Sequence, residues 1–151
     1  MPVGSTPVRH YQQSSPGACL PACVRMALAE LGDERPEAEW AAILGSYEFG
    51  TPASRVLRLA ELGYQVSYGP SSLDIIQAEL AQGRFVIAFV RADLLPWANF
   101  SGFHALLVVE ITKDEVALND PALEDGPRWL SVDAFLIAWQ EFDCLASILS
   151  R

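Results

Sequence analysis

The 151-residue chain has no run of about 18 apolar residues, so no segment is predicted to cross a membrane. Its N-terminal stretch, MPVGSTPVRHYQQ, lacks the apolar centre of a signal peptide. Lysine and arginine number only ten against nineteen acidic residues, which gives a net charge of −9. Neither a nucleic-acid backbone nor an anionic membrane surface is therefore an expected partner. We expect a cytoplasmic protein that does not insert into membranes.

Cysteine is scarce, and its pattern disfavours cross-links and metal binding. The chain has three cysteines, an odd number that cannot pair completely within one molecule. Without an export signal, reduced thiols are the expected state. Cys19 and Cys23 have C-x3-C spacing with no second pair, which is a poor zinc signature. We expect neither a metal ion nor another cofactor.

The chain has the length of one domain, residues 1–151, and 51% of its residues are apolar, enough for a sizeable core. It contains no internal repeat. The first half is rich in helical segments bounded by proline, serine and glycine. Helices are predicted at residues 19–31, 37–44, 53–62 and 71–83, with a short strand at 64–69.

The second half changes character, because its apolar runs are rich in β-branched residues and have the length of strands. Strands are predicted at residues 84–92, 103–112, 116–121 and 144–150, with a helix at 131–142. Helices followed by a mostly antiparallel sheet define an α+β fold, with the N-terminal helices packed on the sheet. The loop 94–102 carries Trp97 and Phe100, which either border a cleft or pack onto the sheet. Three other tryptophans are expected to anchor the packing: Trp40, Trp129 and Trp139.

A cysteine stands where the first helix is expected to begin, in the stretch SSPGACLPACVRM. The positive end of a helix dipole and the unpaired N–H groups of the first turn both favour thiolate over thiol. Cys19 is therefore the candidate nucleophile. Cys23 lies one turn further along the helix and is expected to pack in the core, as is Cys144.

A nucleophilic cysteine needs a base and a group that orients the base. His104 opens a predicted strand, and Asp120 closes the next one, at the same end of the hairpin. An aspartate there can accept the imidazole N–H and stabilise the imidazolium. Gln13 lies six residues before Cys19, where its side-chain amide and the Cys19 backbone N–H can form an oxyanion hole. Gln12 is expected to face elsewhere.

In this order, QSSPGACLPACVRMAL, GFHALLVV and LNDP resemble the motifs of the papain-like cysteine peptidases that process bacteriocin double-glycine leaders. The likeness covers nearly the whole chain. It implies a papain-like fold, with Cys19 as nucleophile, His104 as base, Asp120 as its orienting group and Gln13 in the oxyanion hole. The implied partner is a peptide or flexible protein segment, with a Gly-Gly or Gly-Ala leader precursor as one candidate. The oligomeric state is not predicted.

The sequence departs from the family pattern at two positions beside the nucleophile. Leu20 stands where the family usually has glycine, and Ala18 stands where it usually has aspartate. We expect the Leu20 side chain to narrow the approach to Cys19. Cleavage coupled to export is not expected, since the sequence shows no membrane segment or nucleotide-binding domain. Two alternatives to a peptidase remain: an amidase or acyl-transferase with the same thiolate chemistry, and a catalytically silent peptide-binding domain.

Overall fold

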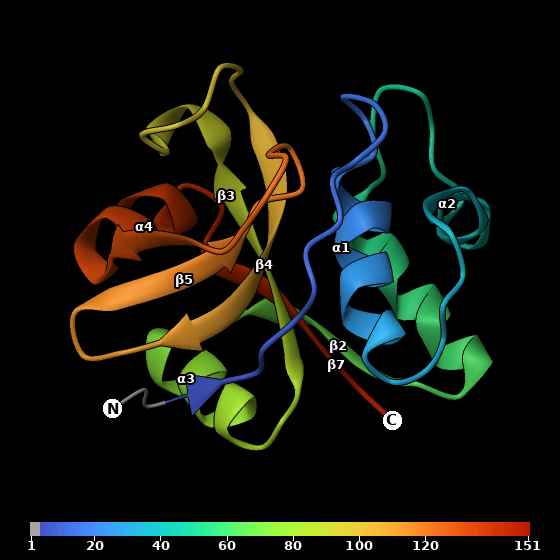
Figure 1. Cartoon of the computed structure of the whole chain (residues 1–151), viewed down its shortest axis with the longest axis horizontal. Helices are drawn as coiled ribbons and strands as arrows, with labels where there is room; N and C mark the ends of the chain where they lie inside the picture. The colour runs from blue at the N-terminus through green and yellow to red at the C-terminus, as the bar shows by residue number, and fades with distance from the viewer. Residues whose placement is uncertain (1–3) are drawn as a thin grey trace.

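A computed structural model describes residues 4–151 as helices and strands that form one layered unit (Figure 1). The helical elements are α1 (Cys19–Ala29), α2 (Glu37–Leu44), α3 (Leu73–Ala81) and α4 (Val132–Gln140), with the 3-10 helices η1 (Ala53–Leu62) and η2 (Ala92–Leu94). The strands are β1 (Gly4–Ser5), β2 (Gln65–Pro70), β3 (Phe85–Arg91), β4 (Phe103–Ile111), β5 (Glu115–Asn119), β6 (Arg128–Ser131) and β7 (Leu145–Ser150).

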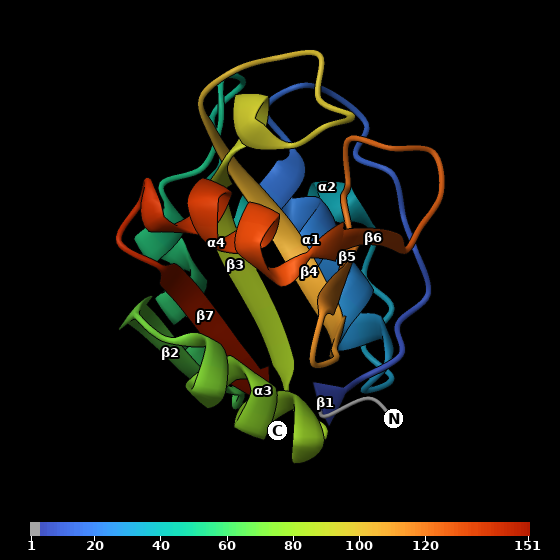
Figure 2. The same ribbon diagram turned by 90° about the vertical axis from the view of Figure 1, so that its left-hand side faces the viewer.

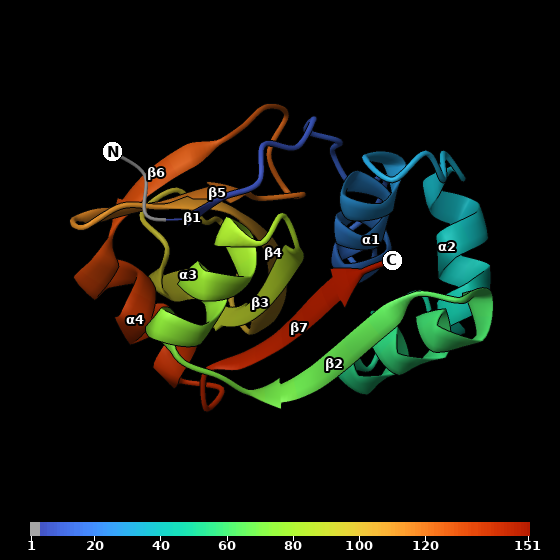
Figure 3. The same ribbon diagram turned by 90° about the horizontal axis from the view of Figure 1, so that it is seen from below.

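All the strand pairings are antiparallel, in the order β2-β7-β3-β4-β5-β6, and β1 pairs with the end of β4. Helices cover both faces of this sheet. In Figure 2, α3 and α4 lie in front of the sheet and α1 and α2 lie behind it. Figure 3 shows the same layers edge-on. The central strands are therefore shielded from water on both sides, which explains their continuous apolar runs.

The alternation of side chains along the central strands divides the core into two clusters. On β3, Ile87 and Phe89 pack with α1, α2 and η1, whereas Val86 and Ala88 pack with α3 and α4. Side chains of a strand point to opposite faces in turn, so one run of apolar residues supplies both cores. The register of β4 in the sheet places the polar end of this strand beside the start of α1, where the candidate residues lie.

The predicted α+β architecture, with helices on a mostly antiparallel sheet, is confirmed. The strands β1 and β6 were not predicted, because segments of two and four residues carry almost no periodic signal. Residues 53–62 form a 3-10 helix. The first helix ends at Ala29, two residues before its predicted end.

Two expectations about individual side chains are wrong. Trp40 and Trp139 are fully buried as expected, but Trp129 lies on the edge strand β6 with 44% of its surface exposed. Leu20 does not narrow the approach to Cys19, because its side chain points into the helical core and is only 2% exposed. A leucine in place of the family glycine therefore contributes to packing at this position.

Candidate active site

Cys19 is the first residue of α1, preceded by Ala18 at the N-cap position. The first turn contains no acidic side chain, and Ala18 provides no side-chain cap. The positive end of the helix dipole is therefore not neutralised locally. The backbone groups of Ala105 and Leu20 lower the pKa of the Cys19 thiol. The start of the helix thus supplies the environment that stabilises a thiolate.

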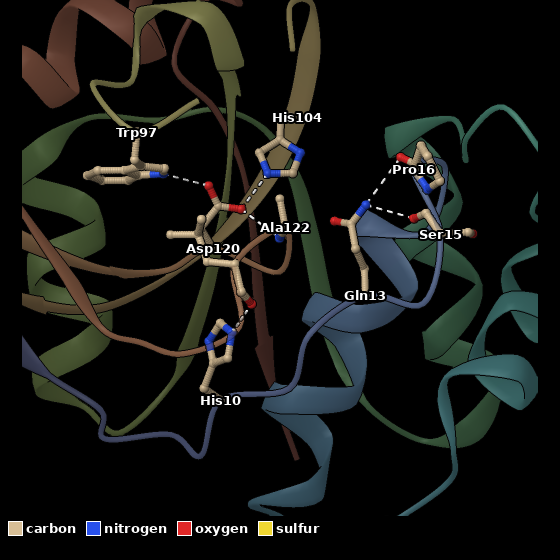
Figure 4. Close-up of polar contacts among 9 residues, drawn as sticks. His10, Gln13, Ser15, Pro16, Trp97, His104, Asp120 and Ala122 are labelled. Carbon is tan, nitrogen blue, oxygen red and sulfur yellow. Dashed lines mark hydrogen bonds and ion pairs between the residues drawn. The ribbon is translucent and has the colours of Figure 1, made fainter. Parts of the chain in front are cut away.

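His104 lies near the start of β4 and reaches both other candidate residues. Its Nε2 is 2.7 Å from Oδ1 of Asp120, which directly follows β5, and both side chains are 2% exposed. Its second ring nitrogen points away from Asp120, toward the side of α1 (Figure 4). Cys19 and His104 line the same cleft, and each shifts the pKa of the other. The structure therefore brings together Cys19, His104 and Asp120, which the sequence placed in three separate segments.

Asp120 has two further hydrogen-bond donors. The indole Nε1 of Trp97 donates to Oδ2 at 2.9 Å, and the backbone N–H of Ala122 donates to Oδ1 at 2.9 Å (Figure 4). The Phe100 ring meets the His104 ring edge-on, with centroids 4.9 Å apart. The sequence left open whether Trp97 and Phe100 border a cleft or pack on the sheet. In the structure both contact the His104–Asp120 pair, and Trp97 is a functional candidate that the sequence did not single out.

The pKa shifts of the three residues favour an ion pair between Cys19 and His104. Burial raises the pKa of Cys19, but the hydrogen bond and charge of His104, with the two backbone N–H groups, outweigh it, so the pKa is lowered from 9.0. Burial lowers the pKa of His104, but its hydrogen bonds to Asp120 and Cys19 prevail and raise it to about 9. Burial also raises the pKa of Asp120, yet its bonds to His104 and Trp97 keep it below 3.8.

Gln13 is near the predicted place but its amide is turned away from the expected direction. Its Nε2 donates to the carbonyl oxygens of Ser15 at 2.7 Å and Pro16 at 3.2 Å (Figure 4). Oε1 is buried without a hydrogen-bond partner. Exchanging the two amide atoms would place an oxygen against two carbonyls, so only this orientation forms the two hydrogen bonds. Gln12 is exposed, as expected.

The segment that carries Gln13 is tied to the turn that carries Asp120. The Gln13 backbone N–H donates to the Pro121 carbonyl at 2.7 Å, and His10 Nε2 donates to the Leu123 carbonyl at 2.8 Å (Figure 4). Asn119 Nδ2 donates to the Val8 carbonyl at 3.1 Å. These three bonds hold residues 8–13 along residues 119–123. His10 thus has a structural role in this contact.

A cleft of about 340 Å³ opens beside the thiol. Its lining joins the start of α1, the loop before η1 and the start of β4: Pro16, Gly17, Cys19, Tyr47, Phe49, Gly50, Thr51, Pro52, Phe100, Phe103 and His104. Clefts of this size with apolar walls and a few polar groups are typical of ligand sites. Within residues 4–151, no group of three His, Cys, Asp or Glu side chains is arranged to hold a metal ion. Among the same residues, no helix is both long and apolar enough to span a membrane.

A cysteine, histidine and aspartate at the junction of a helix start and an antiparallel sheet are the features of the papain-like class. Residues 5–147 match the Peptidase_C39-like family, and the chain belongs to it. The resemblance inferred from the sequence motifs is thereby confirmed. No curated protein sequence matches the chain.

Solved structures of peptidase domains share the fold at low sequence identity. The peptidase domain of Streptococcus ComA, a bi-functional ABC transporter, has a TM-score of 0.74 at 16% identity, covering 94% of this chain and 97% of that one. A putative C39-like peptidase from Bacillus anthracis has a TM-score of 0.73 at 12% identity, covering 96% and 98%. A double glycine motif protease from the AMS/PCAT transporter, in complex with its leader peptide, has a TM-score of 0.73 at 18% identity, covering 97% and 93%. The papain-like fold predicted from the motifs is confirmed.

The first prediction concerns the relative reactivity of the thiols. Iodoacetamide at neutral pH should alkylate Cys19 well before Cys23 or Cys144, because the pKa of Cys19 is lowered while burial raises the pKa of the other two. Peptide mapping by mass spectrometry after brief exposure measures the order. His104→Gln should slow the labelling of Cys19 selectively. Equal labelling of all three thiols would contradict the assignment.

The second prediction concerns the indole that binds Asp120. Trp97→Phe keeps an aromatic ring but removes the donor to Oδ2, so the unfolding free energy should fall by roughly 1.5–3 kcal/mol at neutral pH. Because the pKa of folded Asp120 is lowered, this contribution should disappear progressively as the pH falls below 3.8. Urea unfolding measures both effects. Trp129→Phe, at an exposed ring, is the control and should change little.

Proposed function

We propose that the protein is a cysteine peptidase that cleaves a peptide bond in a peptide or flexible protein segment. The observation that carries this proposal is the buried His104–Asp120 hydrogen bond, whose imidazole lines the same cleft as the Cys19 thiol and lowers its pKa. Membership in the Peptidase_C39-like family supports the same reaction class. Peptide binding by the AMS/PCAT transporter protease supports a peptide as the substrate. A double-glycine leader is one candidate within this class.

The proposed acylation step begins with the thiolate–imidazolium pair. The Cys19 sulfur attacks the carbonyl carbon and forms a C–S bond, while the carbonyl oxygen takes up the negative charge. His104 gives its proton to the leaving amine as the C–N bond breaks. Asp120 accepts the Nε2–H of His104 throughout, which holds the ring in line and stabilises its positive charge. The products of this step are a thioester on Cys19 and a free amine.

Hydrolysis of the thioester completes the proposed cycle. Neutral His104 removes a proton from water, the resulting hydroxide attacks the acyl carbon, and the C–S bond breaks to regenerate the pair. No metal ion or redox partner is required, because each proton moves between the substrate, water and the imidazole. The same acyl-enzyme reacts with an added amine in a transferase, so the nucleophile that finishes the reaction distinguishes the two activities.

The oxyanion hole of this mechanism combines a backbone and a side-chain donor. The Cys19 backbone N–H lies in the first turn of α1, where helix N–H groups lack intrahelical acceptors. Gln13 provides the second donor by transferring one N–H from the Pro16 carbonyl, its longer bond at 3.2 Å, to the oxyanion. The stronger bond to Ser15, at 2.7 Å, keeps the amide in place during this change.

The third prediction tests the proposed function. A library of peptides incubated with the protein should yield hydrolysis products, and Cys19→Ala should abolish them with little loss of stability. Gln13→Ala should reduce kcat by roughly 100-fold, the effect of one lost oxyanion donor. Gln12→Ala, at the exposed neighbouring position, is the matched control and should retain activity.

Three outcomes of this assay would reject the proposal. Cys19→Ala that cleaves as well as the wild type would exclude the thiol as nucleophile. Binding of peptides without turnover by the wild type would indicate a silent binding domain. Acyl transfer to added amines in preference to water, measured by mass spectrometry of the products, would indicate an acyl-transferase.

The fourth prediction is the pH dependence of turnover. The rate of peptide cleavage should rise with pH as the Cys19 thiolate forms, at a pKa below 9.0, and fall as His104 loses its proton at about pH 9. Alkylation by iodoacetamide needs the thiolate but no proton donor, so its rate should not fall above pH 9. Profiles of kcat/KM and of alkylation rate measure the two curves. Parallel curves above pH 9 would show that His104 is not the proton donor.

A further inference from the structure

We propose that Trp97 is a positioning residue of the active site, which acts on His104 through Asp120. Its indole N–H fixes the rotation of the Asp120 carboxylate and thereby aligns the oxygen that accepts the imidazole N–H. Trp97 is not part of the lining of the cleft beside Cys19, so its effect on the reaction is indirect. The inference rests on the proposed peptidase function and adds a residue to its machinery.

The two carboxylate oxygens of Asp120 have different partners (Figure 4). Oδ1 accepts from His104 Nε2 at 2.7 Å and from the Ala122 backbone N–H at 2.9 Å. Oδ2 accepts from Trp97 Nε1 at 2.9 Å, and no other donor reaches it within the part of the chain that the structure describes. The terminal torsion of an aspartate is broad, so a carboxylate turns easily unless both oxygens are held. Trp97 supplies the second point that sets the carboxylate plane.

Burial makes this second point necessary. The Asp120 side chain is only 2% exposed, so an Oδ2 that loses its donor stays unpaired unless the carboxylate turns toward another one. Burial raises the pKa of Asp120, but the hydrogen bond and charge of His104, followed by the bond from Trp97, keep it below 3.8. Without Trp97, Asp120 is therefore less well aligned and less readily ionised. Both changes weaken its support of the imidazolium.

An indole suits this role because it donates one hydrogen bond and accepts none, so it does not compete for the imidazole proton. The Trp97 ring packs against the core cluster on the α3 and α4 side of the sheet. Its loop is closed at the base by the Ala92 N–H, which donates to the Gly102 carbonyl at 2.8 Å, and the buried Leu95 anchors it. The donor is thus held by the fold and not by the catalytic groups that it aligns.

Trp139 on α4 offers a comparison within the same molecule. Its indole Nε1 donates to the Leu145 carbonyl at 2.8 Å, and its fully buried ring belongs to the same core cluster. The acceptor is a backbone group of β7 and not a catalytic side chain. Removing this N–H therefore measures what a buried indole hydrogen bond contributes to stability alone.

The fifth prediction replaces Trp97 by its sulfur isostere benzothienylalanine, which keeps the ring shape but lacks the N–H donor. The kcat/KM for a cleaved peptide should fall by roughly 10-fold or more, the scale on which losing the partner of a metal-binding histidine reduces activity. The loss should be in kcat with KM nearly unchanged, because Trp97 does not line the cleft. Trp97→Phe should change kcat in the same direction. Benzothienylalanine at Trp139 is the matched control and should lower stability only.

The pH profile separates positioning from a purely structural role. A misaligned Asp120 stabilises the imidazolium less, so the pKa of His104 should fall from about 9 and the pKa of Cys19 should rise toward 9.0. Both limbs of the kcat/KM profile should therefore move inward, by roughly 0.5 pH unit or more. Two further titratable side chains, Cys23 on α1 and His10 beside the turn after β5, are the same in both proteins. A limb that moves thus reports the Cys19–His104 pair.

Alkylation of Cys19 by iodoacetamide gives a second readout that needs no peptide turnover. Its half-point should move to higher pH in the Trp97 variants and stay in place in the Trp139 control. This result supports the inference even where the wild type cleaves no peptide, an outcome that would reject only the peptidase. Limbs that stay in place or move outward in both assays, or a wild-type kcat/KM despite the lost N–H, would overturn the inference and leave a cleaving enzyme intact.

Discussion

The hydrogen bond between His104 and Asp120 is the constraint around which the site is arranged. Both side chains are 2% exposed, and a buried charge that loses its partner typically costs about 3–5 kcal/mol. The surrounding elements therefore have to supply partners. The loop after η2 contributes the Trp97 indole, the turn after β5 contributes the Ala122 N–H, and α1 contributes the Cys19 thiol. Each of these elements is held by its own packing against the sheet, so the geometry of the pair follows from the layers of the fold.

Residues 8–13 connect the two sides of the site. They run beside the turn that carries Asp120 and continue into the loop that precedes Cys19. This one segment therefore holds Asp120 in position relative to the start of α1. Gly126 packs closely against this contact: a Cβ atom there would lie 2.8 Å from Asn119 Oδ1 and 2.9 Å from His10 Nδ1. Both of these acceptors are buried without a donor. The close backbone approach leaves no room for a side chain at Gly126.

The sequence predicted the elements of the site better than their orientations. Helix and strand patterns, with the family motifs, placed Cys19 and His104 on the correct elements, because local periodicity determines which element each residue joins. Asp120, predicted to close a strand, lies one residue beyond the end of β5. The role of Trp97 was not predictable, since it depends on how a nine-residue loop folds back over the sheet. The Leu20 side chain and the Gln13 amide likewise depend on three-dimensional neighbours. The amide nitrogen of Gln13 donates to two carbonyls that lie only two and three residues further along the chain. The spacing between Gln13 and Cys19 does not reveal these bonds.

The pKa shifts of His104 and Cys19 contribute to the stability of the fold with opposite dependences on pH. Raising the pKa of His104 from 6.5 to about 9 stabilises the fold fully below pH 6.5, and this contribution is lost as the pH rises toward 9. Lowering the pKa of Cys19 has the opposite sense, because its contribution is complete only above 9.0 and is lost as the pH falls toward the folded value. Below pH 9.0, and above both 6.5 and the lowered pKa of folded Cys19, the unfolded chain carries the proton mainly on sulfur and the folded chain carries it on the imidazole. Folding then moves one proton without net uptake or release, so over this range the pair adds almost no pH dependence to stability.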